Sequence, residues 1–470
     1  MAKAEELQGL RDEVEQVSLE IVRLLSKRME LVARIAEAKK KLGEPLVDFE
    51  VERRVRSRLS DEARKLGISE ELVNKITTLM LQESVKLQEA GEKPKRQVSH
   101  FDIFRRAREL EAEGKRVVRL EVGEPDLGAP GEVAGATAEA VKQGRSRYSD
   151  AKGIAELRKK LAEYLSNKYN TEVKAENLIL TPGGRFAIYL TMRTTLNMGD
   201  EIIIIDPSWP MYKNCAEFLG VRPVVVNTSV ENGWLPNADE VAEKITQATR
   251  AIVLNYPCNP TGKVIDRRTF RKLLDIAREN NLYVISDEVY ADYSFSEYPP
   301  SVLEYDDANF IRVSSFSKSW GMTGYRVGYV TASRELVEKM AKINGMLITC
   351  VPEFIQYGCL KALELEETVR RYAEIMKKRM EAAVNTLSKI PATVHKPEGG
   401  MYVFPRINVD GLDSIDFAFD LLEKKHVALA PGTVFGDYSN YIRISLGASE
   451  EDIRRGIELI GEYLQENVKT

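Results

Sequence analysis

Chemically capable side chains follow a series of short β-rich runs in the second part of this sequence. The runs are expected strands at 178–180, 202–205, 224–226, 251–254, 283–285, 310–313 and 327–330. The residues that come soon after them include Gly184, Arg185, Trp209, Asn259, Asp287, Tyr290, Ser315, Ser317, Lys318 and Arg326. Small residues at the start of a helix, such as Gly184, suit an anion. Helical patterns between the runs predict a largely parallel sheet, which binds ligands at the carboxyl ends of its strands.

Each of these groups has an ordinary interpretation when it is taken alone. Gly183-Gly184 is more often a turn than a phosphate site, and Trp209 is more often a packing residue. An isolated Lys318 is usually a solvated lysine. Their occurrence at successive strand ends is what favours a shared site.

The order of these groups closely resembles the fold-type I, class I and II aminotransferases, the aspartate aminotransferase superfamily. The resemblance extends from about Ser99 to Thr470 and rests on several separate motifs. The motifs are Val122-Gly-Glu-Pro-Asp126, Asn259-Pro-Thr-Gly262, Asp287-Glu-Val-Tyr290 and the run from Ser315 through Lys318 to Arg326. The resemblance implies a pyridoxal 5′-phosphate (PLP) cofactor, for which a protein supplies attachment, orientation and electrostatics.

The same resemblance implies a role for each residue. Lys318 would bind the cofactor as a Schiff base and move the substrate proton. The other cofactor contacts would be Asp287 on the pyridine nitrogen, Tyr290 and Asn259 on the phenolic oxygen, Trp209 on the ring face, and Gly184, Ser315, Ser317 and Arg326 on the phosphate. Tyr148 would reach the phosphate of a neighbouring subunit, which implies a homodimer with shared sites.

Two arginines concern the substrate. Arg443, in Asn-Tyr-Ile-Arg443-Ile-Ser, matches the family's arginine for the substrate α-carboxylate, with the backbone near Gly123 beside it. Arg185 stands where some relatives have a neutral residue. We hypothesise that Arg185, at the cofactor pocket, pairs with a second carboxylate and so favours dicarboxylic substrates.

The first part of the chain has a different pattern. Apolar residues at 7, 10, 14, 17, 21, 24 and 31 follow a 3–4 spacing that predicts one long helix over about 5–41. Further helices are expected after Asp48 and from Ser69, and 92–98 reads as a linker. The seam position between 24 and 31 is occupied by Arg28, and a charge on an apolar seam needs a partner or a ligand. A dimerising coiled coil with a polar register residue is the ordinary interpretation.

These positions resemble the AroQ-type chorismate mutases over about Glu5 to Ala90. The resemblance implies that Arg28 and a partner subunit's Arg11 bind the carboxylates of chorismate. Lys39 and Gln88 would stabilise the ether oxygen, Asp48 and Glu52 would hold the hydroxyl end, and Ser84 would assist at a carboxylate. Positioning and electrostatics suffice for such a rearrangement. Val51 departs from the family, which usually has arginine there.

The predicted fold class is α/β, with a division into three parts. Residues 1–91 form an all-helical mutase-like domain, 92–98 the linker and 99–470 a PLP-transferase fold. Within the latter, about 141–365 form a large domain with a mostly parallel sheet, and about 99–140 with 366–470 form a smaller α+β domain.

The fused parts predict a bifunctional enzyme of aromatic amino acid biosynthesis. It would convert chorismate to prephenate and transaminate prephenate, aryl-pyruvates or aspartate/glutamate-type substrates. The alternative is a general aspartate aminotransferase whose helical domain only dimerises or senses a ligand, which Val51 favours. A PLP-dependent lyase or racemase is a third possibility.

Composition limits the remaining classes of function. The net charge of −4 over 470 residues gives no reason to expect nucleic-acid binding. No apolar run reaches membrane-spanning length, and four scattered cysteines predict free thiols in a reducing cytoplasm. We expect small-molecule partners only (amino acids, 2-oxo acids and chorismate), no metal, and an assembly of two subunits or more.

Overall fold

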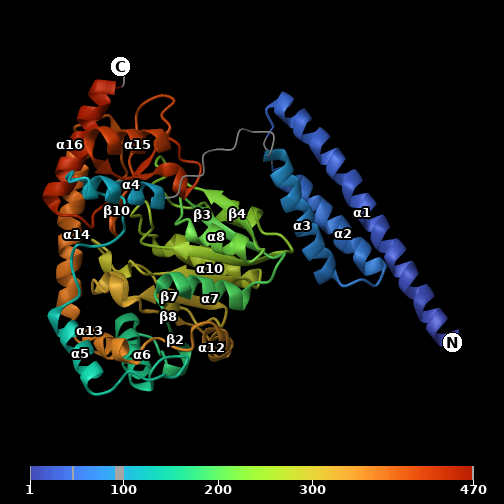
Figure 1. The fold of residues 1–470 in the computed structure, drawn as a ribbon, viewed down its shortest axis with the longest axis horizontal. Helices are drawn as coiled ribbons and strands as arrows, with labels where there is room; N and C mark the ends of the chain where they lie inside the picture. The colour runs from blue at the N-terminus through green and yellow to red at the C-terminus, as the bar shows by residue number, and fades with distance from the viewer. Residues whose placement is uncertain (1, 45–46, 90–99, 468–470) are drawn as a thin grey trace. The chain divides into compact units, whose positions relative to one another are not determined.

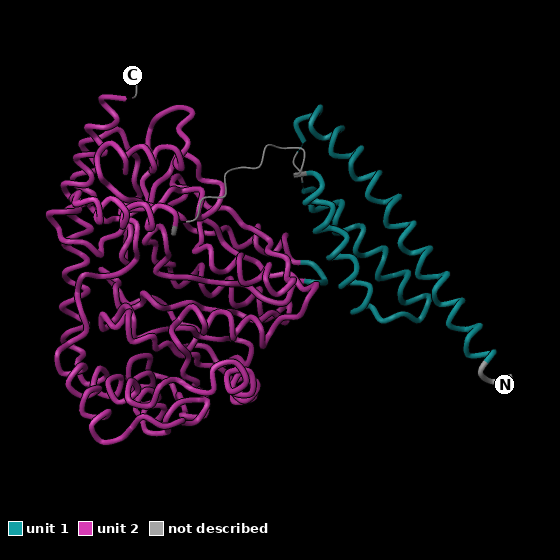
Figure 2. Tube along the Cα trace, viewed as in Figure 1, with its two compact units in different colours: residues 1–97, 246–248 teal, residues 98–245, 249–470 magenta. Residues whose placement is uncertain are grey.

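The computed structural model describes residues 2–44, 47–89 and 100–467. The chain divides into two compact units, residues 1–97 with 246–248 and residues 98–245 with 249–470 (Figure 2). The expected linker 92–98 lies outside the described residues. Each unit is considered by itself below.

Three helices make up the described part of the first unit: α1 (Ala2–Leu42), α2 (Phe49–Lys65) and α3 (Glu70–Glu89). Gly43 ends α1 with a φ of 70°, a conformation that favours glycine. The Asp48 carboxylate caps α2 by accepting the Val51 N–H, and Ser69 Oγ accepts the Leu72 N–H at the start of α3. The predicted helix starts after Asp48 and at Ser69 therefore match the structure.

The apolar seam along α1 is open in the single chain. The exposed fractions of its residues are Leu7 49%, Leu10 54%, Val14 67%, Val17 57%, Ile21 54% and Leu24 67%. The seam residue Leu31 is also exposed, at 48%, whereas its neighbour Val32 is 7% exposed on the part of α1 that packs on α3. In one chain, a row of large apolar side chains on α1 therefore faces outward.

A seven-stranded sheet forms the centre of the second unit (Figure 1). Its strands, in spatial order, are β2 (Leu178–Thr181), β8 (Gly328–Thr331), β7 (Phe310–Ser315), β6 (Tyr283–Asp287), β5 (Thr249–Asn255), β3 (Glu201–Asp206) and β4 (Arg222–Asn227). All neighbours from β7 to β4 are parallel, and β8 runs antiparallel to both β7 and β2. The seven predicted strands are all present.

Parallel strands are buried on both faces, which explains their continuous apolar runs such as Ile202–Ile205. One face of the sheet packs with α7 (Gly184–Thr195), α8 (Met211–Phe218) and α12 (Arg334–Ile348) in one apolar cluster. Helix α10 (Arg267–Glu279) packs on β6 through a strongly amphipathic surface with Phe270, Leu273 and Leu274 buried. Parallel strands under these helices bring the ends of β3, β5, β6 and β7 to one edge.

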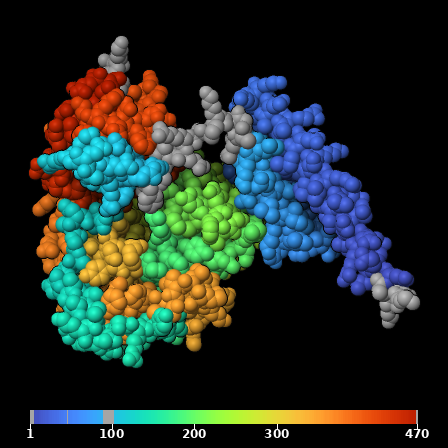
Figure 3. Space-filling view, viewed as in Figure 1, coloured from blue at the N-terminus to red at the C-terminus, as the bar shows by residue number. Residues whose placement is uncertain are grey.

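A second core lies beside the sheet in the same unit. It is formed by α4 (His100–Ala112), α14 (Glu366–Leu387), α15 (Ser414–Lys425) and α16 (Glu450–Asn467) around short strands. These strands are β1 (Val118–Arg119), β9 (Ala392–Thr393), β10 (Tyr402–Val403), β11 (Arg406–Ile407), β12 (Val427–Ala428), β13 (Ala430–Pro431) and β14 (Ile442–Ser445). Figure 3 shows the cyan α4 region against the red C-terminal segments, far apart in sequence.

The remaining helices connect or cover these layers. They are α5 (Gly131–Lys142), α6 (Ala155–Tyr169), α9 (Ala238–Glu243), α11 (Phe316–Ser319), α13 (Glu353–Ala362) and the short 3-10 turns η1 (Ala175–Asn177), η2 (Ala291–Tyr293), η3 (Val302–Glu304), η4 (Thr323–Tyr325) and η5 (Gly432–Phe435). The sequence division places residues 131–140 in the smaller part, whereas α5 packs mainly on α13, in the core that holds Trp320. Among the described residues, no helix is long and apolar enough to span a membrane.

Candidate active site

One pocket of about 420 Å³ lies at the carboxyl ends of the parallel strands. It brings together most of the groups expected from the sequence of the second unit. Its lining includes Gly123, Gly184, Arg185, Trp209, Asn259, Asp287, Tyr290, Ser315, Ser317, Lys318, Arg326 and Arg443. A volume of this size is typical of a small-molecule or cofactor site.

Lys318 lies on α11, a single turn that directly follows β7. Ser315 caps this turn by accepting the Ser317 N–H, with an oxygen–nitrogen distance of 3.0 Å. The Lys318 amine donates a hydrogen bond to the Gly123 carbonyl. Burial lowers the pKa of Lys318 to about 8, with Glu124 opposing the shift and the cations Arg443, Arg326 and Arg185 adding to it. Such an amine is neutral far more often than an ordinary lysine, as nucleophilic attack requires.

Asp287 ends β6, and 4% of it is exposed. Burial raises the pKa of its carboxyl group to about 6, while hydrogen bonds from Tyr212 and the Val289 N–H oppose the shift. The Tyr212 hydroxyl donates at 2.7 Å and the Val289 N–H at 3.2 Å. A buried carboxylate with a raised pKa would favour a positively charged ring nitrogen next to it.

The start of α7 offers a site for an anion. Gly183 precedes the helix with a φ of 90°, and a side chain at this position would overlap the Arg326 guanidinium. Ser315 and Ser317 hydroxyls lie 2.9 Å apart beside it, and Arg326 lines the same pocket. Backbone N–H groups at the helix start, two hydroxyls and a guanidinium together fit a phosphate group.

Arg443 projects from β14 into the pocket and is 5% exposed. Its Nη1 donates to Asn259 Oδ1 at 3.0 Å and its Nη2 to the Glu121 carbonyl at 2.5 Å. The guanidinium lies 4.3 Å from the centre of the Tyr402 ring. The guanidinium lines the pocket, where a ligand carboxylate could bind it, and its buried Nε has no hydrogen-bond partner within the described ranges.

Arg185 and Trp209 line the same pocket, and the Arg185 guanidinium lies 5.4 Å from the centre of the Trp209 ring. Arg185 remains exposed by more than a third in this single chain. Burial of its remaining surface lowers the pKa of Arg185, and Arg326 adds to this shift. The pocket therefore holds two arginines, Arg185 and Arg443, besides the one beside the anion site.

Several other lining residues were not among the site residues expected from the sequence, and three of them matter most here. Tyr212 supports Asp287, Tyr402 shares a 2.8 Å hydroxyl contact with Tyr290, and Phe104 reaches the pocket from α4. Tyr212 could have been found because it lies one helical turn after Trp209. Tyr402 and Phe104 had no local signal, since they come from elements outside the sheet.

Tyr148 is not part of the pocket within one chain. It lies in the segment after α5 and is 86% exposed. Its expected contact is with a neighbouring subunit, so its position in a single chain neither meets nor excludes that expectation.

In the first unit, Arg28, Ser84 and Gln88 come together between α1 and α3. Arg28 Nη1 donates to Ser84 Oγ at 2.7 Å and to the Met80 carbonyl at 3.0 Å. Burial lowers the pKa of Arg28, which is half-buried. Gln88 Nε2 donates to the Ser84 carbonyl, and its buried Oε1 has no hydrogen-bond partner in the described part of the chain. This small cluster therefore holds one cation and one carboxamide around Ser84.

The other expected mutase residues differ in exposure. Lys39 and Glu52 are half-buried, whereas Arg11 and Asp48 are exposed. The Asp48 carboxylate is occupied in capping α2. Val51 is 40% exposed, so the position that usually carries a cation is an apolar surface residue.

A buried amine, a buried carboxylate, a phosphate-sized anion site and a substrate-facing arginine around one pocket define a class of protein, the PLP-dependent transferases. The residues fit this cofactor because each of its charged groups meets an opposite charge or donor. The family comparison agrees. Residues 115–460 match the model for aminotransferase class I and II, and the chain belongs to that family; residues 10–89 match chorismate mutase type II.

Similar proteins cover the second unit. A probable aspartate/prephenate aminotransferase of Aquifex aeolicus is 34% identical over 376 residues, covering 77% of this chain and 95% of the relative. A (5-formylfuran-3-yl)methyl phosphate transaminase of Methanocaldococcus jannaschii is 37% identical over 370 residues, covering 77% and 96%. The aspartate aminotransferase of Thermus thermophilus with maleate superposes with a TM-score of 0.74 at 30% identity, covering 79% and 97%.

The chain therefore joins a chorismate mutase domain to a PLP-dependent aminotransferase. This combination supports a bifunctional enzyme of aromatic amino acid biosynthesis, an isomerase and a transferase in one chain. The alternative of a general aminotransferase with a purely sensing domain is not favoured. The relatives differ in the substrates that their names state, so family membership alone does not choose the oxo acid.

Proposed function

We propose that the second unit transaminates an aromatic-pathway oxo acid, prephenate or an aryl-pyruvate, with glutamate or aspartate as a partner substrate. The observation that supports this most directly is the pair of arginines, Arg443 and Arg185, in the pocket that holds Lys318. Prephenate, glutamate and aspartate all carry two carboxylates. Arg443 would bind the one next to the reacting carbon, and Arg185 would bind the other.

The cofactor would supply an electron sink for charge that develops at the substrate carbon. Asp287 would keep the ring nitrogen protonated, and Tyr290 with Asn259 would donate to the ring oxygen. Trp209 would cover one ring face, and Gly184, Ser315, Ser317 and Arg326 would bind the phosphate. Lys318 would carry a proton to and from the substrate carbon, for which a pKa near the working pH is best. Gly123 would keep its carbonyl beside the lysine amine and its N–H near the substrate carboxylate.

For the first unit we propose the rearrangement of chorismate to prephenate at the Arg28 cluster. Arg28 and Ser84 would bind a carboxylate, and Gln88 with Lys39 would stabilise charge on the ether oxygen. Glu52 and Asp48 would meet the hydroxyl end, and Arg11 would come from a second subunit. Val51 removes one expected cation, so we expect weaker chorismate binding than in a mutase that has arginine there.

Both halves are tested in the full chain by two variants. Arg28→Ala should lower chorismate turnover about tenfold to a hundredfold, since charge-assisted hydrogen bonds are worth about 1.5–3 kcal/mol. Lys27→Ala is the matched control, because Lys27 is a neighbouring exposed cation on α1. Lys318→Ala should abolish the absorbance of lysine-bound cofactor and all amino transfer while chorismate turnover continues.

Two results would contradict the assignments. Equal chorismate turnover by the native chain and Arg28→Ala would leave only a sensing or dimerising role for the first unit. Amino transfer by Lys318→Ala would remove the central lysine from the mechanism.

We also propose a homodimer, or a higher assembly, with shared sites in the cytoplasm. Tyr148 is 86% exposed, and Met346 (78%) and Leu347 (53%) at the end of α12 are exposed as well. Asn344 Nδ2 donates to the Ala151 carbonyl at 2.7 Å, which holds the Tyr148 segment beside that helix end. This exposed apolar group, and the open seam of α1, are surfaces that a second copy would cover. All four cysteines are free, in keeping with a reducing compartment.

Mixed subunits test the sharing of sites. Lys318→Ala and Tyr148→Ala homodimers should both be impaired. Unfolded together and refolded, they should regain activity, because one site of the mixed dimer has a native Lys318 from one subunit and a native Tyr148 from the other. No recovery in a verified mixed dimer would place Tyr148 in its own subunit's site or outside any site.

A further inference from the structure

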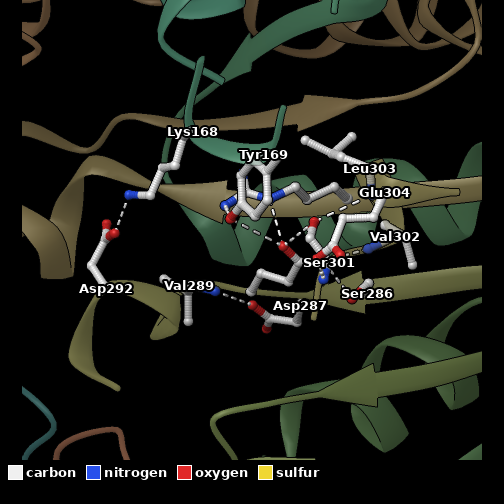
Figure 4. A network of polar contacts seen from close by, with 12 residues as sticks. Lys168, Tyr169, Ser286, Asp287, Val289, Asp292, Ser301, Val302, Leu303 and Glu304 are labelled. Carbon is white, nitrogen blue, oxygen red and sulfur yellow. Dashed lines mark hydrogen bonds and ion pairs between the residues drawn. The ribbon is translucent and has the colours of Figure 1, made fainter. Parts of the chain in front are cut away.

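A network of mostly buried polar side chains adjoins the segments that carry Asp287 and Lys318; Figure 4 shows part of it, with Lys168, Tyr169, Asp287 and Asp292 labelled. We call it the rear network and define it as Lys168, Tyr169, Glu288, Asp292, Tyr298, Arg312 and Ser319. None of these residues lines the pocket. Two of them directly follow cofactor residues in the sequence, since Glu288 follows Asp287 and Ser319 follows Lys318.

The first half of the rear network holds the segment of Lys318. Asp292, on η2, accepts hydrogen bonds from Ser319 Oγ at 2.5 Å and from the Tyr298 hydroxyl at 3.0 Å. Lys168, at the end of α6, forms an ion pair with the same carboxylate. The side chains of Lys168 and Asp292 are only 19% and 13% exposed. One carboxylate thus joins the end of α6 to the turn that carries Lys318.

The Tyr293 hydroxyl strengthens this attachment by donating to the Lys318 carbonyl at 2.5 Å. Tyr293 and Asp292 both belong to η2, which begins immediately after Tyr290. Tyr290 lines the pocket and directly precedes η2, while Asp292 and Tyr293 of η2 bind Ser319 and the Lys318 carbonyl. The distance between Tyr290 and Lys318 therefore depends on η2.

The second half of the rear network holds the end of β6. Glu288 and Arg312 form an ion pair with a 2.7 Å contact, and each side chain is 3% exposed. Glu288 also accepts from Ser286, Ser301 and the Val302 N–H, so its oxygens are fully used. Arg312 donates to the Tyr169 hydroxyl at 3.0 Å. A fully bonded buried pair of this kind has a unique geometry, which fixes the backbone at Asp287.

The two halves meet at the end of α6. Lys168 belongs to the first half and its neighbour Tyr169 to the second. The Tyr169 and Tyr298 hydroxyls lie 3.4 Å apart, and Tyr298 donates to Asp292. A continuous chain of polar contacts thus runs from Glu288, beside Asp287, to Ser319, beside Lys318.

We infer that the rear network, with Lys168 and Tyr169 at its centre, is a positioning unit that sets the spacing of Lys318 and Asp287 across the cofactor. The inference rests on the proposed roles of these two residues. Neither Lys168 nor Tyr169 touches substrate or cofactor. They act by holding the end of β6, which carries Asp287, and the turn that carries Lys318 in fixed positions relative to each other. A small displacement of either would misalign the amine and the ring.

Three variants and one control test the inference in the holoenzyme. Lys168→Met leaves the Asp292 carboxylate without its cation, Tyr169→Phe removes only one hydroxyl, and Lys168→Arg restores the charge. Lys160→Met is the control, because Lys160 lies on the same helix and pairs with Glu364 at the surface, away from the network. The measurements are the cofactor dissociation constant, the spectroscopic pKa of the lysine-bound cofactor, and kcat and KM separately.

We expect Lys168→Met and Tyr169→Phe to weaken cofactor binding and lower kcat by about tenfold or more, the usual effect of losing a supporting contact. The spectroscopic pKa should shift, and KM should change little because Arg443 is untouched. Lys168→Arg should restore most of the native behaviour, and Lys160→Met should match the native enzyme.

A different pattern would overturn the inference. If Tyr169→Phe and Lys168→Met lowered only the melting temperature, with native spectroscopic pKa and cofactor affinity, the rear network would be purely structural. Should Lys168→Met not fold, Tyr169→Phe and Ser319→Ala decide the question by the same readouts. If instead the proposed role of Lys318 were wrong, Lys318→Ala would keep the native cofactor absorbance. That result distinguishes a failure of the catalytic role from a failure of the positioning role.

Discussion

Replacement of Asp287 by asparagine should stabilise the cofactor-free protein while weakening its hold on the cofactor. The Asp287 carboxyl is buried and its pKa is raised to about 6, against about 3.8 for an exposed aspartate. Each unit of pKa difference corresponds to about 1.4 kcal/mol, so ionised Asp287 costs the folded cofactor-free chain about 3 kcal/mol. Asparagine has the same shape and no charge.

The pH dependence follows from the direction of this shift. Below pH 3.8 the carboxyl is neutral in both states and costs nothing. Between 3.8 and 6 the unfolded chain releases the proton before the folded chain does, so stability falls as the pH rises. Above 6 the cost is constant. The cost therefore grows by about 1.4 kcal/mol between pH 5 and pH 8, and this growth is absent in Asp287→Asn.

The loss of one hydrogen bond in Asp287→Asn offsets part of this stabilisation. The two carboxylate oxygens of Asp287 accept from Tyr212 and from the Val289 N–H, respectively. Asparagine has only one carbonyl oxygen, so it can keep only one of these two hydrogen bonds. This loss costs about 1 kcal/mol at every pH, which leaves a net stabilisation of about 2 kcal/mol at pH 8. Cofactor affinity should fall, because the charge-assisted bond to the ring nitrogen is lost.

The assay is chemical unfolding of the cofactor-free protein at pH 5 and pH 8, with cofactor binding measured on the same samples. The control is Asp239→Asn, on an exposed residue of α9. The reasoning is refuted if the stability difference between native protein and Asp287→Asn is the same at both pH values. It is also refuted if the variant binds the cofactor as tightly as the native protein.

Two further substitutions examine the substrate contacts. Arg443→Lys keeps the charge but loses the planar guanidinium and its 3.0 Å bond to Asn259. We expect KM for every amino acid to rise about tenfold or more while cofactor affinity stays native. An unchanged KM would exclude Arg443 from carboxylate binding. Arg185→Ala should reduce kcat/KM for glutamate more than for a monocarboxylic amino acid, and an equal loss with both would refute the dicarboxylate hypothesis.

Local sequence signals were sufficient for the strands and for the residues at their ends. The strand end, the Ser315 cap and Lys318 are consecutive in the sequence, so their positions relative to one another follow from local geometry alone. The same holds for Asp287 at the end of β6 and for Asp48 before α2. The predicted helix of the first unit was recognisable because its apolar spacing continues without interruption by proline.

The contributions of distant segments could not be derived in this way. Tyr402 comes from a two-residue strand whose place is set by pairing with β14, and it supports both Tyr290 and Arg443. Phe104 reaches the pocket only because α4 packs into the second core. The rear network depends on Lys168, which has no motif of its own and looks like an ordinary lysine at a helix end.

Burial shifts the pKa values of Lys318 and Asp287 in the directions that the site requires. A lysine with a pKa of 10.5 is neutral in about 0.03% of molecules at pH 7, whereas a lysine with a pKa of about 8 is neutral in roughly a tenth of them. Asp287, with a pKa of about 6, is mostly ionised at the same pH. A neutral amine and a charged carboxylate therefore coexist without any proton transfer between them. Both shifts arise mainly from burial, and the rear network bonds to the segments of both residues, since Glu288 directly follows Asp287 and Asp292 accepts from Ser319. Positioning and pKa are thus consequences of the same buried contacts, which is why loosening them should change the spectroscopic pKa as well as the rate.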